Sequence, residues 1–76
     1  MSEFPQYRKL SNSRAFYRIE NEFLFTEIQL IGKKSFELHF KATKYPEILK
    51  IKEMLACEEP YLISSIQEFE NYKESN

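Results

Sequence analysis

The sequence predicts an α+β fold, in which an antiparallel β-meander of three to four strands is followed by a helix, a short strand and a C-terminal helix. Two patterns support this prediction. In residues 24–30 and 36–42, on either side of the single glycine, apolar and polar residues alternate with a period of two, as in strands with one buried face. After Pro46, apolar residues recur at spacings of three and four, which is typical of an amphipathic helix.

The hairpin around Gly32 determines which face of the sheet we expect to be buried. A fold at Lys33 makes one face apolar in both strands and leaves the other face polar. The apolar face then pairs Leu30 with Phe36, Ile28 with Leu38, Thr26 with Phe40 and Leu24 with Ala42. The solvent-facing surface pairs Gln29 with Glu37, Glu27 with His39 and Phe25 with Lys41.

The turn chemistry of Gly32 favours a different register. A glycine at the first central position suits a two-residue type II′ loop, which would pair Ile31 with Lys34 and place Ile28 opposite Glu37. Because burial of one continuous apolar face should outweigh a turn preference, we expect a longer loop or a bulge that restores the apolar pairing.

Two earlier segments fit the same sheet. Residues 7–10 are a possible edge strand, and residues 15–20 are rich in aromatic and β-branched side chains, as strands are. A turn at residues 21–22 places the apolar residues of this second segment on the predicted buried face. The expected pairs are Ile19 with Leu24, Tyr17 with Thr26 and Ala15 with Ile28.

The helical part begins at Pro46, a favoured residue of a first helical turn, and the pattern continues to about Cys57. Residues 61–63 are apolar and predict a short strand. Ser65 followed by Glu68 has the form of a capping box and predicts a last helix. We expect that helix to direct Ile66, Phe69 and Tyr72 inward, and residues 1–6 and 74–76 to be loose.

Length and composition indicate one small domain over residues 1–76. Seven Phe and five Tyr can supply a core for so short a chain, because each aromatic ring buries roughly 150–250 Å². A single cysteine forms no internal disulfide, and the first residues lack the apolar stretch of a secretory signal. No apolar run approaches the roughly 18 residues of a membrane span. These observations predict a cytoplasmic protein.

Charge is unevenly distributed along the chain. Residues 1–52 contain ten Lys or Arg and six Glu, a net charge of +4, whereas residues 53–76 contain one Lys and six Glu, a net charge of −5. Such asymmetry fits either a basic binding face with an acidic tail or an acidic C-terminal part that folds against a basic sheet. The shared apolar pattern of both halves favours the second interpretation.

The residue inventory argues against an enzyme. The chain has no Asp, one His, one Cys and one Gly, so it lacks zinc-ligand spacings and a glycine-rich phosphate loop. We therefore predict no catalytic residues, no metal and no cofactor. Cys57 is interpreted as an inert thiol and His39 as part of an ordinary surface ion pair.

The most informative predicted surface is the outer face of the sheet. Half-exposed Phe on a small sheet is more often covered by a helix of the same chain or by a second copy than by nucleic acid, and we predict a small protein-interaction module that acts through a sheet face or an edge strand, with a homodimer as one form. The alternative is a single-stranded nucleic-acid-binding accessory protein, in which bases stack on the rings, although three Glu on the same face oppose it. The candidate residues on the sheet face are Phe16, Arg18, Phe25, His39 and Lys41, and those at the hairpin tip are Lys33 and Lys34.

Overall fold

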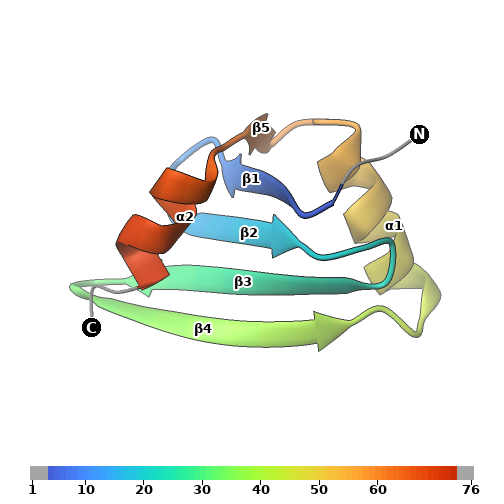
Figure 1. Cartoon of the computed structure of the whole chain (residues 1–76), viewed down its shortest axis with the longest axis horizontal. Coiled ribbons are helices and arrows are strands. Elements are labelled where there is room, and N and C mark those ends of the chain that lie inside the picture. The colour runs from blue at the N-terminus through green and yellow to red at the C-terminus, as the bar shows by residue number, and fades with distance from the viewer. Residues whose placement is uncertain (1–3, 74–76) are drawn as a thin grey trace.

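A computed structural model of the chain describes residues 4–73 and confirms the predicted order of elements. Four strands form a meander, and a helix, a short strand and a second helix follow it (Figure 1). The elements are β1 (Gln6–Leu10), β2 (Ala15–Ile19), β3 (Leu24–Ile31), β4 (Lys34–Lys41), α1 (Tyr45–Leu55), β5 (Tyr61–Ile63) and α2 (Ile66–Lys73). None of the helices in this part of the chain is long and apolar enough to traverse a bilayer.

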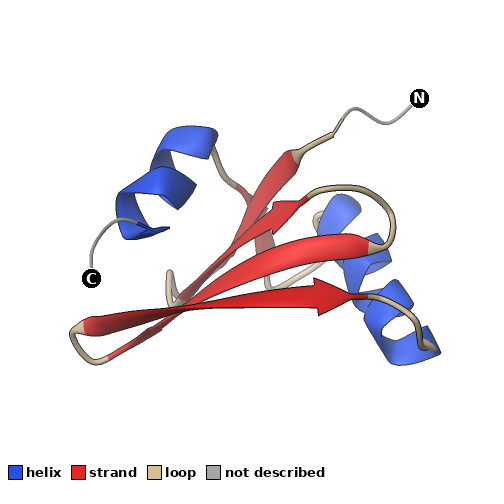
Figure 2. Ribbon diagram, turned by 60° about the horizontal axis from the view of Figure 1, so that its bottom comes forward, coloured by secondary structure: helices blue, strands red, loops and turns tan. Residues whose placement is uncertain are grey.

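The five strands form one antiparallel sheet in the order β4-β3-β2-β1-β5. Strand β5 returns after α1 to pair with β1, so the last strand in the chain lies beside the first. The two helices lie on opposite faces of this sheet (Figure 2). Each face of the sheet is therefore covered in part by a helix, whereas the sequence pattern predicted one buried and one solvent-facing surface.

Both predicted hairpin registers are wrong by one residue. In the β3–β4 hairpin Ile31 pairs with Lys34, and Ile28 lies opposite Glu37 rather than Leu38. The β2–β3 hairpin is displaced in the same way, because Ile19 pairs with Phe25 instead of Leu24. Of the two alternatives that the sequence offered at Gly32, the two-residue loop is the one that forms.

The turn preference of Gly32 decided this register, because the burial of one continuous apolar face favours the alternative register less than expected. Gly32 has a φ of 61°, the positive value that the first central residue of a type II′ turn requires and that glycine adopts without a side-chain clash. A one-residue displacement moves the apolar side chains of a strand from one face of the sheet to the other. This move is unfavourable only if the second face is exposed to solvent. Here a helix covers part of each face, so apolar side chains find cover on either side.

The larger core lies between the sheet and α1. Ile51 and Met54 of α1 are buried against Tyr17, Ile19 and Phe25 of the central strands. The Phe25 ring stacks on that of Phe40, with centroids 4.9 Å apart. Six further residues pack around this cluster in part: Phe4, Leu10, Phe40, Ile48, Leu55 and Tyr61.

The smaller core lies between the opposite face and α2. Phe16 and Ile28 of the sheet are buried against Phe69 of α2. Tyr72 stacks on Phe16 with ring centroids 4.3 Å apart. Phe69 and Tyr72 thus lie against the sheet as predicted, but Ile66 is 58% exposed, because α2 begins beyond the end of the apolar cluster.

Local signals set the ends of both helices. Helix α1 begins at Tyr45, where the Glu47 carboxylate accepts the backbone N–H of Lys44 at 3.3 Å. It ends two residues before the predicted Cys57, which has a φ of 57° and donates its N–H to Met54 O, while Glu58 donates to Glu53 O. This is a Schellman cap. At α2, the Ser65 hydroxyl accepts the Glu68 N–H at 3.1 Å, as the capping pattern predicted.

Candidate interaction surface

Strand β4 forms one edge of the sheet and has the most exposed surface of the long strands. It pairs with β3 on one side only, and most of its residues are exposed (Figure 1). At the edge of a sheet, alternate residues of a strand present backbone groups that a further strand can pair with. The β4 edge is therefore the first feature of the candidate surface.

The alternation of backbone hydrogen bonds shows which residues of β4 face this edge. Ala42, directly after β4, donates its N–H to Phe23 O at 2.6 Å, toward β3. In an antiparallel strand, backbone groups of alternate residues point to the same side. Leu38 and its even-numbered neighbours therefore bond to β3, and the backbone groups of Glu37 and His39 point to the open edge.

An apolar strip lies beside this edge, on the face that α1 covers only in part. It consists of Ile31, Phe36 and Leu38, which are 61%, 45% and 38% exposed. Their neighbours across the β3–β4 ladder are polar, since Leu38 pairs with Glu27 and Phe36 with Gln29. The strip exists because the observed register places Phe36 and Leu38 of β4 on the α1 side of the sheet together with Ile31 of β3, whereas Ile28 of β3 faces α2.

The two aromatic residues of the predicted surface are not available for binding. Phe16 and Phe25 are each 2% exposed and lie on opposite faces of the sheet. Phe25 therefore does not lie outward beside Arg18 and Lys41, because the register that placed it there is wrong by one residue. The predicted row of one ring between two cations does not form.

Three other predicted residues do share a face. Arg18 and His39 flank Thr26 in one row of the sheet, and the Lys41 side chain projects to the same side from the next row. Each of the first two already has a partner. Arg18 Nε lies 3.0 Å from Glu20 Oε2 in an ion pair without hydrogen-bond alignment, and His39 contacts Thr26 Oγ1 at 3.0 Å and Glu37 Oε2 at 3.2 Å. His39 thus pairs with Glu37, not with Glu27 as predicted.

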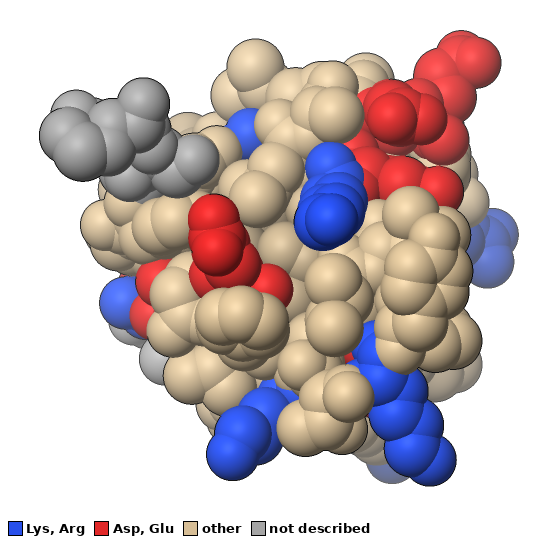
Figure 3. All heavy atoms as spheres, turned by 90° about the vertical axis from the view of Figure 1, so that its right-hand side faces the viewer, with Lys and Arg blue, Asp and Glu red and all other residues tan. Residues whose placement is uncertain are grey.

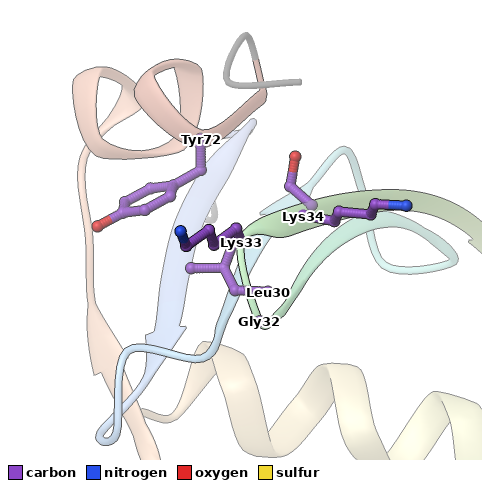
Figure 4. Close-up of a pocket in the computed structure, with 6 residues that line it drawn as sticks. Leu30, Gly32, Lys33, Lys34 and Tyr72 are labelled. Atoms are coloured by element: carbon purple, nitrogen blue, oxygen red, sulfur yellow. The ribbon is translucent and has the colours of Figure 1, made fainter.

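The two tip lysines line a recess of about 150 Å³ between the hairpin and α2. Lys33 points toward Tyr72 across this recess, whereas Lys34 points away along β4 (Figure 4). The lysines therefore do not converge on one point, and the arrangement offers no paired site for an anion.

Sequence reasoning did not identify Arg8, which is the most buried cation described. Its Nε donates to Met54 O at 2.7 Å and one terminal nitrogen contacts Leu55 O at 3.3 Å, so the guanidinium caps the C-terminal end of α1. A positive charge at this end of a helix is favourable. The available signal in the sequence was that a charged residue, Arg8, stands in the middle of the strand of residues 6–10.

A second buried charge, Glu27, was also missed. Its carboxylate accepts a hydrogen bond from Gln29 at 3.0 Å and lies 3.6 Å from Lys50 Nζ of α1. The Lys50 ammonium also lies 5.3 Å from the ring centroid of Tyr17 and 5.5 Å from that of Phe25, within the range of a cation–π contact. Burial, followed by the Glu27 charge, raises the pKa of Tyr17 well above its ordinary value of 10.

A second hollow lies at the other end of the molecule, beside α1. It is a cleft of about 310 Å³ lined by Phe23 and Ile48, among others, and by Lys52. Figure 3 views this end and shows acidic and basic side chains distributed around a largely uncharged surface. The cleft lies between α1 and the loop before β3, and its lining residues are not part of a strand edge.

Within residues 4–73, no group of three or more His, Cys, Asp or Glu side chains is placed to hold a metal ion. Cys57 is a free, half-buried thiol at the cap of α1. In comparisons with known protein families, curated proteins and solved structures, no match to this chain was found.

Proposed function

We propose that this chain is a small, non-enzymatic interaction module that binds an extended polypeptide segment along its β4 edge. The observation that carries the proposal is the combination of an open strand edge with the apolar strip of Ile31, Phe36 and Leu38 beside it. In this mode of recognition, main-chain hydrogen bonds supply affinity, and alternate side chains of the added strand rest on the neighbouring surface.

A nucleic-acid ligand is less well supported. Stacking of bases requires exposed rings, and Phe16 and Phe25, on which that alternative rested, are both buried. The remaining cations of that face, Arg18 and Lys41, lie beside carboxylates such as Glu20 and Glu37, which repel phosphate. A polypeptide partner requires neither rings nor a basic field.

A proline substitution on the open edge tests the proposal. His39→Pro removes a backbone N–H that points away from β3. Edge strands tolerate proline at such positions, because no hydrogen bond within the sheet is lost. The matched control His39→Thr removes the same side chain but keeps the N–H. In affinity capture from cell extract, we expect proteins that bind the wild type and His39→Thr but not His39→Pro, and slowed deuterium exchange of the Glu37 and His39 amides in the complex.

A second pair of variants tests the apolar strip without altering the backbone. Phe36→Lys introduces a charge into the strip, and Phe23→Lys does so in the cleft beside α1, at a phenylalanine of similar exposure. Circular dichroism verifies that each variant is folded. Loss of the captured proteins with Phe36→Lys alone supports the proposal, whereas loss with Phe23→Lys alone, or unchanged capture by Phe36→Lys and His39→Pro, contradicts it.

A further inference from the structure

We infer that the polypeptide segment bound along β4 is β4 of a second copy of this chain, paired antiparallel about a two-fold axis at Leu38. This inference rests on the proposed function, since it names the partner of the same edge. It joins two five-stranded sheets into one continuous sheet. Three features of β4 support it: the direction of its backbone groups, the polar residues Glu37 and His39 at its edge, and the pattern of the apolar strip.

Complementary hydrogen-bonding groups favour this register on the α2 side of the sheet. With Leu38 opposite Leu38 of the second copy, Glu37 faces His39 of the second copy, and the same pair recurs across the axis. These are the residues whose backbone groups point to the open edge, so each pair also exchanges main-chain hydrogen bonds. Opposite or complementary polar residues directly across a sheet are favourable, and like charges are not.

The apolar residues on the other face fit the same register. Leu38 meets Leu38 of the second copy, and Phe36 meets Phe40 of the second copy on both sides of the axis. Phe36 and Leu38, the two members of each apolar strip that lie on β4, then each have an apolar neighbour in the second copy. Aromatic and aliphatic cross-strand pairs of this kind stabilise antiparallel ladders.

Neighbouring registers are less favourable. A displacement by an odd number of residues places the apolar face of one strand beside the polar face of the other. A displacement by two residues in one direction sets Glu37 opposite Glu37 of the second copy. In the other direction it sets His39 opposite itself and leaves Phe36 facing Ala42, without an aromatic partner.

The symmetry of this pairing also limits its extent. Two identical edges that pair about a two-fold axis form a closed dimer, whereas pairing of β4 with the β5 edge of another copy would continue without end. The closed arrangement uses the long edge of each copy and leaves only the three-residue strand β5 at the outer edges. A short outer edge is one of the ways in which proteins avoid aggregation.

Site-specific disulfide formation tests the register. Each variant is made in a Cys57→Gly background, which removes the native thiol and suits the positive φ of 57° at that position. The Leu38→Cys chain carries its thiol on the axis, where Cα atoms of a non-hydrogen-bonded pair lie about 4.5 Å apart, within disulfide range. Glu37→Cys and His39→Cys place the thiol on the axes of the two neighbouring registers.

We expect Leu38→Cys to form a covalent dimer under mild oxidation at least about tenfold faster than Glu37→Cys or His39→Cys alone. A mixture of Glu37→Cys and His39→Cys should form the mixed dimer rapidly, because these positions face each other in the inferred register. Sedimentation should show a concentration-dependent dimer for the wild type and His39→Thr and a monomer for His39→Pro.

Other outcomes separate the two proposals. Faster cross-linking of Glu37→Cys or His39→Cys overturns the register at Leu38. A wild-type chain that stays monomeric at all concentrations, with no cross-linking of Leu38→Cys, overturns the inference of a second copy. The proposed function then still stands or fails independently, by whether His39→Pro loses captured proteins that His39→Thr retains.

Discussion

The two edges of the sheet differ in how their backbone groups are protected. At the β5 edge, the strand has three residues, Pro60 precedes it, and α2 begins three residues after it ends. At the other edge, β4 extends for eight residues, and β3 is its only paired strand within residues 4–73. Shortness and proline are common means of protecting an edge, and β4 has neither. This difference between the two edges is the reason for proposing β4, and not β5, as the edge that binds a partner.

The packing around each edge agrees with this division. At the β5 edge, polar contacts join α2 to β1 and to the residue that follows β5. Glu68 of α2 accepts a hydrogen bond from Ser64 at 2.6 Å and from Lys9 of β1 at 3.0 Å. Beside β4, the exposed side chains of Phe36 and Leu38 lie opposite Gln29 and Glu27. Variants that affect one edge and not the other test the comparison.

The largest effect is expected from removing the main anchor of α2. Phe69 is 1% exposed and joins α2 to Phe16 and Ile28, so Phe69→Ala should lower the free energy of unfolding by about 3–5 kcal/mol. For so small a domain this is a large part of the total. Urea denaturation measures the change. Ile66→Ala, on the exposed side of the same helix, is the control and should change stability by less than about 0.5 kcal/mol.

Arg8 should have the next largest effect, because β1, the strand that pairs with β5, is joined to α1 through its guanidinium. Arg8→Met keeps the aliphatic part of the side chain but removes the guanidinium donors from Met54 O, which keeps the Cys57 N–H, and from Leu55 O. We expect a loss of about 2–3 kcal/mol by thermal or urea unfolding. Lys9→Met, which removes only the ion pair with Glu68, should cost less than about 1 kcal/mol. Equal losses in the two variants would contradict the assigned role of Arg8.

At the β4 edge, substitution should affect association far more than folding. Phe36→Thr replaces a 45% exposed ring by a good strand-forming residue, so the stability of the dilute monomer should change by less than about 0.5 kcal/mol. Sedimentation of the same protein should show loss of the dimer. Phe40→Thr, in the same strand, removes the ring stacked on Phe25 and should lower stability by more than about 1 kcal/mol. A destabilised Phe36→Thr monomer would show that β4 serves the fold as β5 does.

The smallest effect concerns the acid response of the β5 edge. Hydrogen bonds from Ser64 and then Lys9 lower the pKa of Glu68 below its ordinary value of 4.5. The unfolded chain therefore binds the proton first as pH falls, and the stability that Glu68 contributes is present above about pH 4.5 and lost below it. Glu68→Gln should consequently lose less stability than the wild type between pH 6 and pH 3 in thermal unfolding scans. An identical acid response in the two proteins would contradict this assignment.

The order of elements could be predicted from the sequence, but the registers could not be predicted from apolar alternation alone. Periodicity, Pro46 and Ser65 located the strands and helices to within two residues. The register prediction assumed a single buried face, and this assumption failed because α1 and α2 cover opposite faces. The turn preference of Gly32, which does not depend on burial, indicated the observed pairing.

The candidate surface depended on the register, and so most of it could not be predicted. A shift by one residue moved Phe25 into the α1 core and brought Phe36 and Leu38 to an exposed face. Arg8 and Glu27 were missed because their charges are balanced by distant elements, a helix end and Lys50. The expectation of an edge strand as an interaction element remains as a proposal.

The hairpin described above has a consequence for the order in which the chain acquires its structure. Its apolar residues face both sides of the sheet, since Ile28 faces α2 while Phe25 and Leu38 face the other way. A nascent hairpin that has left the ribosome before the helices would consequently expose apolar side chains on both sides, because it cannot bury either side by folding on itself. The two helices that cover those sides, α1 and α2, are both synthesised after it.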